Sequence, residues 1–81
     1  MTKTITIEYY ALLKEKRGTS RESIQTDAQT ARQLYEELHK KYQFPLSVEA
    51  LRVAVNDEFS RWNHILKEGD RVIFIPPVAG G

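Results

Sequence analysis

The feature that most constrains the fold is one long amphipathic helix pattern near the middle of a chain of 81 residues. Apolar side chains recur at the spacing i, i+3, i+4, i+7 and i+11, in Ala31, Leu34, Tyr35, Leu38 and Tyr42. Thr30 and Gln33 have the spacing of a capping box, so we expect the helix to begin there. Phe44-Pro45 ends it, because proline disfavours helical geometry in the preceding residue. Such a stripe lays one side of the helix onto a sheet.

Strand patterns supply that sheet. They cover four segments before the last strand, residues 4–9, 22–26, 51–56 and 58–60. The first alternates strictly and places Ile5, Ile7 and Tyr9 on one face, whereas the second alternates weakly and is expected to be an edge. The third ends in the turn residues Asn56-Asp57, and the fourth is expected to pair back on it. Residues 11–17 predict a short helix that ends at Gly18.

The last strand, from Arg71 to Ile75, is apolar at four consecutive positions. This is typical of a strand buried on both faces, so we expect it at the centre of the sheet. A first hairpin, a crossing helix and a last strand inserted beside the first define an α+β fold of the β-grasp, or ubiquitin-like, type. One main helix then packs on one face of a mixed sheet. We expect residues 1–75 to form this domain and residues 76–81 to form an extended functional tail.

Composition excludes several functions. Twelve Lys and Arg against eleven Asp and Glu give a net charge of +1, so neither nucleic acid nor a membrane is an expected partner. The chain has no cysteine, which excludes disulfides and a cysteine nucleophile, and no metal site is expected at His39 or His64. The N-terminus does not resemble a signal peptide and no run approaches the roughly 20 apolar residues of a membrane span, so we expect a cytoplasmic protein.

The chain changes character after Ile75. Pro76 and Pro77 fix φ and lack N–H donors, so the chain must leave the sheet in an extended form. At roughly 3.3 Å per residue, the segment 76–81 reaches about 20 Å. Gly80 and Gly81 have no Cβ and can pass through a narrow channel. We therefore predict that a partner takes in the tail, which consists of Pro76, Pro77, Val78, Ala79 and Gly80 and presents the α-carboxylate of Gly81 as the reactive group.

A carboxylate is an anion at neutral pH and has no leaving group, so that of Gly81 must first be activated. Transfer of AMP from ATP makes an acyl-adenylate, which a sulfur nucleophile displaces to leave a thiocarboxylate. The chain contains no GxxxxGK[ST] phosphate-binding sequence. We therefore expect a separate enzyme to use the ATP and no cofactor to be bound by this chain.

These features together resemble the small-subunit family of molybdopterin synthase, often called MoaD. The resemblance covers essentially the whole chain, and its most specific part is the ending Phe74-Ile75-Pro76-Pro77-Val78-Ala79-Gly80-Gly81. Other matching parts are the capped helix, Tyr10-Ala11-Leu12-Leu13, Ala54-Val55-Asn56 and Gly69-Asp70. Thiamin-pathway sulfur carriers also end in Gly-Gly but usually lack the Pro-Pro pair, which favours the molybdopterin assignment.

The resemblance implies a sulfur-delivery cycle. A MoeB-like enzyme would adenylate Gly81, a sulfur donor would make the thiocarboxylate, and the large subunit, MoaE, would receive the tail. Sulfur would pass to cyclic pyranopterin monophosphate, giving molybdopterin for the molybdenum cofactor. The chain would be a cosubstrate more than a catalyst, within a heterotetramer of two copies of each subunit. Position in the family pattern implies that Tyr10, Phe59 and Ile75 contact the partner.

Three alternatives stay open. The first is a thiocarboxylate carrier for thiamin or another sulfur pathway. The second is a ubiquitin-like modifier joined to lysines through Gly81, and the third is an interaction domain whose tail is incidental. The first shares the tail chemistry and differs only in its partners. The second and third predict no sulfur on Gly81.

Overall fold

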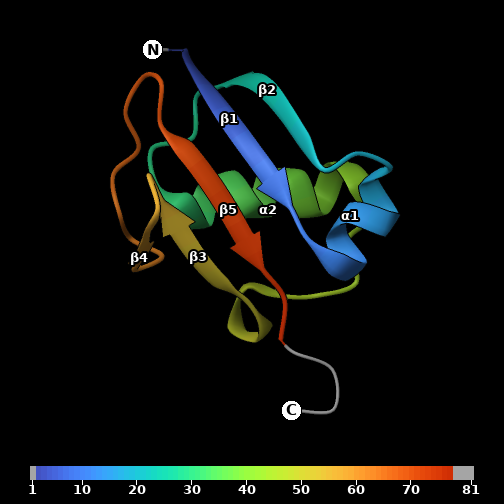
Figure 1. Cartoon of the computed structure of the whole chain (residues 1–81). Coiled ribbons are helices and arrows are strands. Elements are labelled where there is room, and N and C mark those ends of the chain that lie inside the picture. Colours follow the sequence, from blue (N-terminus) through green and yellow to red (C-terminus); the bar gives the residue numbers. More distant parts are fainter. Residues whose placement is uncertain (1, 78–81) are drawn as a thin grey trace.

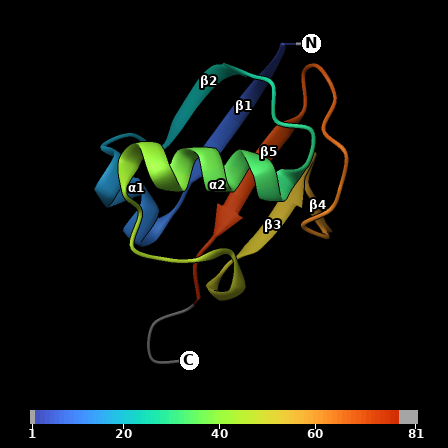
Figure 2. The same cartoon turned by 180° about the vertical axis from the view of Figure 1, so that it is seen from behind.

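A five-stranded mixed sheet carries one long helix across a single face in the computed structural model, which describes residues 2–77 (Figures 1 and 2). In chain order the elements are β1 (Lys3–Tyr9), α1 (Ala11–Arg17), β2 (Arg21–Thr26), α2 (Ala31–Tyr42), the 3-10 helix η1 (Val48–Ala50), β3 (Arg52–Val55), β4 (Glu58–Ser60) and β5 (Arg71–Ile75). The strand order is β2-β1-β5-β3-β4, and only the β1–β5 pair is parallel. The predicted β-grasp fold is confirmed. Within residues 2–77, neither helix has the length and hydrophobicity needed to span a bilayer.

Helix α2 begins as the sequence predicts. The Gln33 backbone N–H donates to Thr30 Oγ1 over 3.1 Å. The Gln33 side-chain oxygen accepts a hydrogen bond of 2.8 Å from the backbone N–H of Gln29. In a regular capping box the donor would be the next residue, Thr30. Four of the five predicted stripe residues are fully buried against the sheet and Tyr42 is half-buried. The helix ends where Gln43 adopts a left-handed φ of 55°.

The core lies between α2 and the inner face of the sheet. Phe74 on β5 is its centre, with its ring 5.0 Å from that of Tyr35 and 6.0 Å from that of Trp62. The Tyr35 hydroxyl donates to the Leu46 carbonyl over 2.6 Å, and burial raises the pKa of Tyr35 to about 12. Trp62 stacks parallel to Phe74 and closes one end of the core.

Strand β5 is central, as predicted, but it is not buried on both faces. Val72 and Phe74 point into the core and are fully buried, whereas Ile73 and Ile75 point the other way and stay half-exposed. The reason is that α2 covers only one face, and no described helix covers the other (Figures 1 and 2). An apolar run on a central strand therefore marks an uncovered apolar face here, not a second core.

The start of β5 is held by side chains from the preceding hairpin. Asn56 and Asp57 adopt φ values of 52° and 73°, as a two-residue turn between β3 and β4 requires. The Asn56 side chain donates to Asp70 Oδ1 over 2.9 Å and accepts from the Arg71 backbone N–H over 2.9 Å. This interlock fixes the register of β5, and hence the point where the chain leaves the sheet.

A second polar cluster joins β1, α1 and β2. The Tyr9 hydroxyl donates to Glu22 over 2.6 Å, and the Arg17 guanidinium donates to the same carboxylate over 3.0 and 2.7 Å. Burial alone would raise the pKa of Glu22, but the hydrogen bonds from Arg17 and Tyr9 outweigh it and lower the pKa. Burial is the main cause that raises the pKa of Tyr9, and the hydrogen bond to Glu22 raises it further. Glu22 is therefore an anion that ties α1 to the sheet.

Glu22→Gln should lower the free energy of unfolding by about 1.5–3 kcal/mol near neutral pH, the usual range for hydrogen bonds to a charged group. Folding lowers the pKa of Glu22, so its contribution is complete above the unfolded value of about 4.3 and is lost as pH falls through the lower folded value. The gap between wild type and variant should therefore narrow in acid. Urea unfolding at neutral and acidic pH measures it, with Glu36→Gln, an exposed carboxylate, as the control. A gap that does not change with pH would contradict this assignment.

Candidate functional site

The root of the predicted tail is the carboxyl end of β5. Pro76 is half-buried and Pro77 is exposed, and they are the last described residues. The predictions for Val78, Ala79, Gly80 and Gly81 lie outside the described residues. The division of the chain into a domain of residues 1–75 and a tail of residues 76–81 stays a prediction, although β5 does end at Ile75.

Strand pairing holds the tail root in place as far as Ile75, the last residue of β5. Phe74 pairs with Tyr9 on one side and with Val53 on the other, and all three are buried. Ile75 pairs with Arg52. Because hydrogen bonds to two neighbouring strands and the packing of Phe74 all act within this short stretch, the chain leaves the sheet at a fixed position and in a fixed direction.

The three residues predicted to contact a partner are accessible to different degrees. Phe59 on β4 is 73% exposed and Tyr10, which precedes α1, is 49% exposed. Ile75 is half-buried on the uncovered face of the sheet. Exposed aromatic side chains of this size are typical of binding surfaces, and the role of these three in binding stays a prediction.

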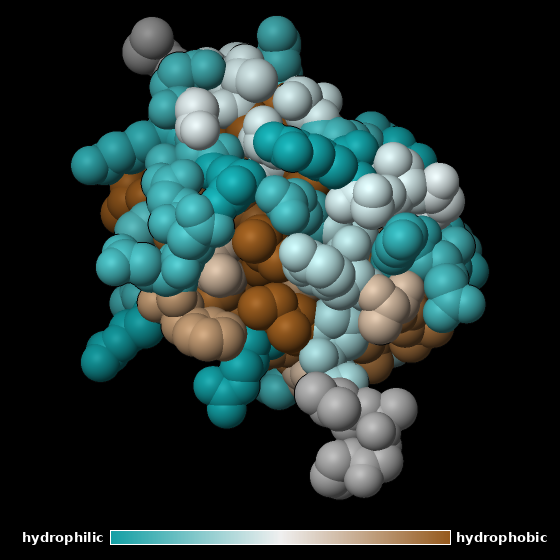
Figure 3. Space-filling view, in the orientation of Figure 1, coloured by the Kyte–Doolittle hydropathy of each residue, from teal (hydrophilic) through white to brown (hydrophobic). Residues whose placement is uncertain are grey.

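The structure brings Tyr10 and Ile75 together but leaves Phe59 apart. Tyr10 and Ile75 line one groove beside the tail root, with a volume of about 560 Å³. Phe59 pairs with Ala54, which pairs with Ile73, so these three lie in one row across the uncovered face. Figure 3 shows hydrophobic surface in the middle of this face, bordered by hydrophilic surface. One apolar face therefore extends from β4 to the tail root.

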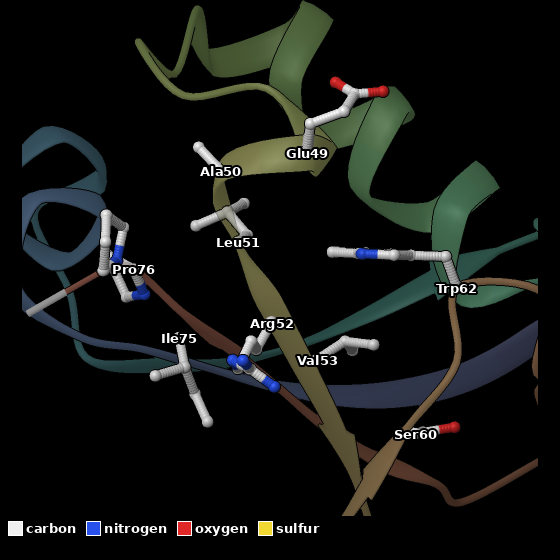
Figure 4. Close-up of a pocket in the computed structure, with 10 residues that line it drawn as sticks. Glu49, Ala50, Leu51, Arg52, Val53, Ser60, Trp62, Ile75 and Pro76 are labelled. Atoms are coloured by element: carbon white, nitrogen blue, oxygen red, sulfur yellow. The ribbon is translucent and has the colours of Figure 1, made fainter.

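A second hollow of about 460 Å³ lies on the other side of the root (Figure 4). Its lining includes Leu51, Arg52 and Trp62 together with Ile75 and Pro76. Sequence reasoning missed Arg52 as a neighbour of the tail and Ile73 as a surface residue. The sequence did contain a signal for Ile73. Side chains alternate between the two faces of a strand, so Ile73 must point away from the core that Val72 and Phe74 enter.

Ion pairs border the apolar face at the end opposite the root. The Arg71 guanidinium lies 3.5 Å from the Glu8 carboxylate and also contacts Asp57. Within residues 2–77, no group of three or more His, Asp or Glu side chains is arranged to hold a metal.

Known proteins are similar to this chain in sequence and in fold. The model of the ThiS family matches residues 7–81. The molybdopterin synthase sulfur carrier subunit of Escherichia coli (strain K12) is 30% identical over 80 residues, which are 95% of this chain and 99% of that protein. A putative molybdopterin converting factor subunit 1 from Pyrococcus furiosus is 28% identical with a TM-score of 0.77, over 94% of this chain and 99% of that one. The complex of subunits 1 and 2 of the molybdopterin-converting factor from Helicobacter pylori contains a chain that is 25% identical with a TM-score of 0.64, over 96% and 99%.

The fold and the exit of the chain from the central strand define a ubiquitin-like β-grasp protein. The chain belongs to the ThiS family, whose model it matches from residue 7 to Gly81. It is thus a ubiquitin-like sulfur carrier of the ThiS/MoaD type.

Phe59→Ala should change the free energy of unfolding by no more than about 0.5 kcal/mol, because the ring is mostly in solvent. The matched substitution Phe74→Ala should cost about 3–5 kcal/mol, because it leaves a cavity between Tyr35 and Trp62. Urea denaturation of both variants measures the difference. If Phe59→Ala cost as much as Phe74→Ala, Phe59 would belong to the core and not to a free surface.

Proposed function

We propose that this chain is the sulfur carrier subunit of molybdopterin synthase and that the carboxylate of Gly81 carries the sulfur. The main support is the relative from Escherichia coli, which is named as that subunit and is 30% identical across 95% of this chain. The family match runs to Gly81, so it includes the tail. The Pro76-Pro77 pair, which thiamin-pathway carriers usually lack, favours molybdopterin over thiamin as the product.

The carrier chemistry begins with activation. A Gly81 carboxylate oxygen attacks the α-phosphorus of ATP, pyrophosphate leaves, and an acyl-adenylate forms on a MoeB-like enzyme. Sulfide supplied by the sulfur donor attacks the acyl carbon as hydrosulfide, and AMP leaves with the electrons of the carbon–oxygen bond. The product is a thiocarboxylate at Gly81. ATP belongs to the activating enzyme, and this chain needs no cofactor of its own.

Delivery takes place in the large subunit. The thiocarboxylate sulfur attacks a side-chain carbon of cyclic pyranopterin monophosphate and displaces an oxygen from that carbon, and water then cleaves the acyl–sulfur bond and restores the Gly81 carboxylate. Two such deliveries complete the dithiolene of molybdopterin. Since the carrier has lost its sulfur when it leaves after each delivery, it acts as a cosubstrate of a cytoplasmic, heterotetrameric synthase.

The folded domain explains why a tail alone would not suffice. Ordering a flexible segment costs roughly 1–2 kcal/mol per residue, so a free peptide of residues 76–81 would lose most of its binding energy. The apolar face around Ile73 and Ile75, extended by Phe59 and Tyr10, offers contact area that supplies this energy. The Helicobacter pylori structure, a complex of subunits 1 and 2, supports docking on a large subunit.

An alternative keeps the same tail chemistry and changes the partner. A carrier for thiamin or another sulfur pathway would also be adenylated and thiocarboxylated at Gly81. Deletion of the gene separates the two, because the proposed function requires the loss of molybdoenzyme activity. A thiamin requirement with normal molybdoenzymes would favour the alternative.

One glycine added after Gly81 should reduce molybdopterin formation to background without lowering the free energy of unfolding. The added residue converts the Gly81 carboxylate into a peptide bond and leaves the core untouched. The assay combines the chain with the activating enzyme, ATP, a sulfur donor, the large subunit and cyclic pyranopterin monophosphate, and it measures molybdopterin. One glycine added before Thr2 is the control and should keep full activity. Full activity of the C-terminal variant would refute the mechanism.

A further inference from the structure

The groove beside the tail root has a mixed lining. It is formed by the start of α1, the loop after α2 and the end of β5, and its lining includes Tyr10, Leu12, Glu15, Leu46, Ile75 and Pro76. All of these side chains are apolar or aromatic except one carboxylate. The family resemblance implied a role for Tyr10 and Ile75 only, so Leu12, Glu15 and Leu46 are the new features of this groove.

Helix α1 and the residue before it hold two of these side chains toward solvent. The helix buries only Leu13 in the core, while Leu12 is 43% exposed and Tyr10 is 49% exposed. Ala11, between the two, has a left-handed φ of 51°, which residues other than glycine seldom adopt. Strained backbone of this kind is often kept at binding sites. The local fold therefore presents Tyr10 and Leu12 at the surface at the cost of backbone strain.

The carboxylate of Glu15 is available for a partner. Glu15 follows Leu12 by three residues on α1, which places both on the same side of the helix. Among residues 2–77, no salt bridge involves Glu15 and no Lys or Arg lines the groove. The Tyr10 hydroxyl lies 3.5 Å from Glu8, but Arg71 already pairs with that carboxylate. The groove is thus apolar, and the one charged side chain in its lining is Glu15, which forms no salt bridge within residues 2–77.

We propose that this groove binds a long basic side chain, arginine or lysine, of the large subunit, an inference that rests on the proposed function. The aliphatic stem lies against Leu12, Leu46 and Ile75. The cationic end pairs with Glu15 and contacts the Tyr10 ring. A purely apolar side chain would leave Glu15 partly desolvated without a partner, which costs free energy.

Continuity with the tail identifies the source of that side chain. Ile75, Pro76 and Pro77 line the groove and lead directly into the tail. A protein that takes in the predicted tail therefore binds the chain next to this groove. We expect the large subunit to supply this side chain, because the similar Helicobacter pylori structure is a complex of subunits 1 and 2.

Binding of the full chain to the purified large subunit from the same organism tests the inference, with isothermal titration calorimetry at low and high NaCl. Glu15→Lys and Leu12→Asp should each raise Kd by at least about tenfold, since one places like charge at the partner cation and the other removes the apolar wall. Glu15→Gln should raise Kd less, by about threefold to tenfold, and should reduce the dependence of Kd on NaCl.

The controls make the same kinds of change away from the groove. Glu36→Lys alters an exposed carboxylate of α2, and Ile65→Asp alters an apolar side chain that is 60% exposed in the loop before β5. Both should bind with the wild-type Kd. Thermal unfolding of every variant checks the fold, and Leu12→Ser replaces Leu12→Asp if that variant unfolds.

The outcomes separate this inference from the proposed function. If the Leu12 variant binds weakly and both Glu15 variants bind normally, the occupant is apolar and the inference is overturned. If all groove variants bind the large subunit like the wild type, the large subunit does not use the groove. The inference then fails while the proposed function stands, and this holds also if the variants raise only the Kd for the activating enzyme. If the wild-type chain itself does not bind the large subunit, the proposed function fails and takes the inference with it.

Discussion

The insertion of β5 between β1 and β3, with Phe74 buried against Tyr35 and Trp62, is the interaction on which the rest of the structure depends. A parallel β1–β5 pair requires a long connection between its strands, and α2 lies within that connection and covers the inner face. The last strand of the chain is therefore also its most central one. The position of the tail root is therefore set by a strand whose inward side chains, Val72 and Phe74, are fully buried in the core.

The two faces of the sheet have different roles. The inner face provides stability through one apolar core under α2. The outer face keeps Ile73 and Ile75 half-exposed and adds Phe59, while the groove at the tail root adds Tyr10 and Leu12. This arrangement would suit the proposed carrier, because the domain offers apolar area and the Glu15 carboxylate for docking beside the root of the predicted tail.

Much of this follows from local sequence rules. The capped stripe from Ala31 predicts α2, strict alternation predicts β1, and Asn56-Asp57 predicts the β3–β4 turn, because each depends on neighbouring residues only. Burial of β5 on both faces was the wrong prediction, since an apolar docking face and a second core give the same run of residues. The groove could not be predicted, because Leu12, Leu46 and Ile75 meet only in the fold and the left-handed Ala11 has no sequence signal. Residues 78–81 lie outside the described part of the chain, so the tail itself stays a prediction.

The most direct test of the central claim is the intact mass of the wild-type chain after incubation with the activating enzyme, ATP and a sulfur donor. The proposed carrier chemistry predicts a mass increase equal to the replacement of one oxygen by one sulfur, and fragmentation should place that sulfur at Gly81. The increase should be absent when ATP is omitted, because the carboxylate must be adenylated before sulfur can displace a leaving group. An unchanged mass with active partner enzymes, or a Gly81 found joined to lysine side chains, would contradict the claim that this terminus carries sulfur.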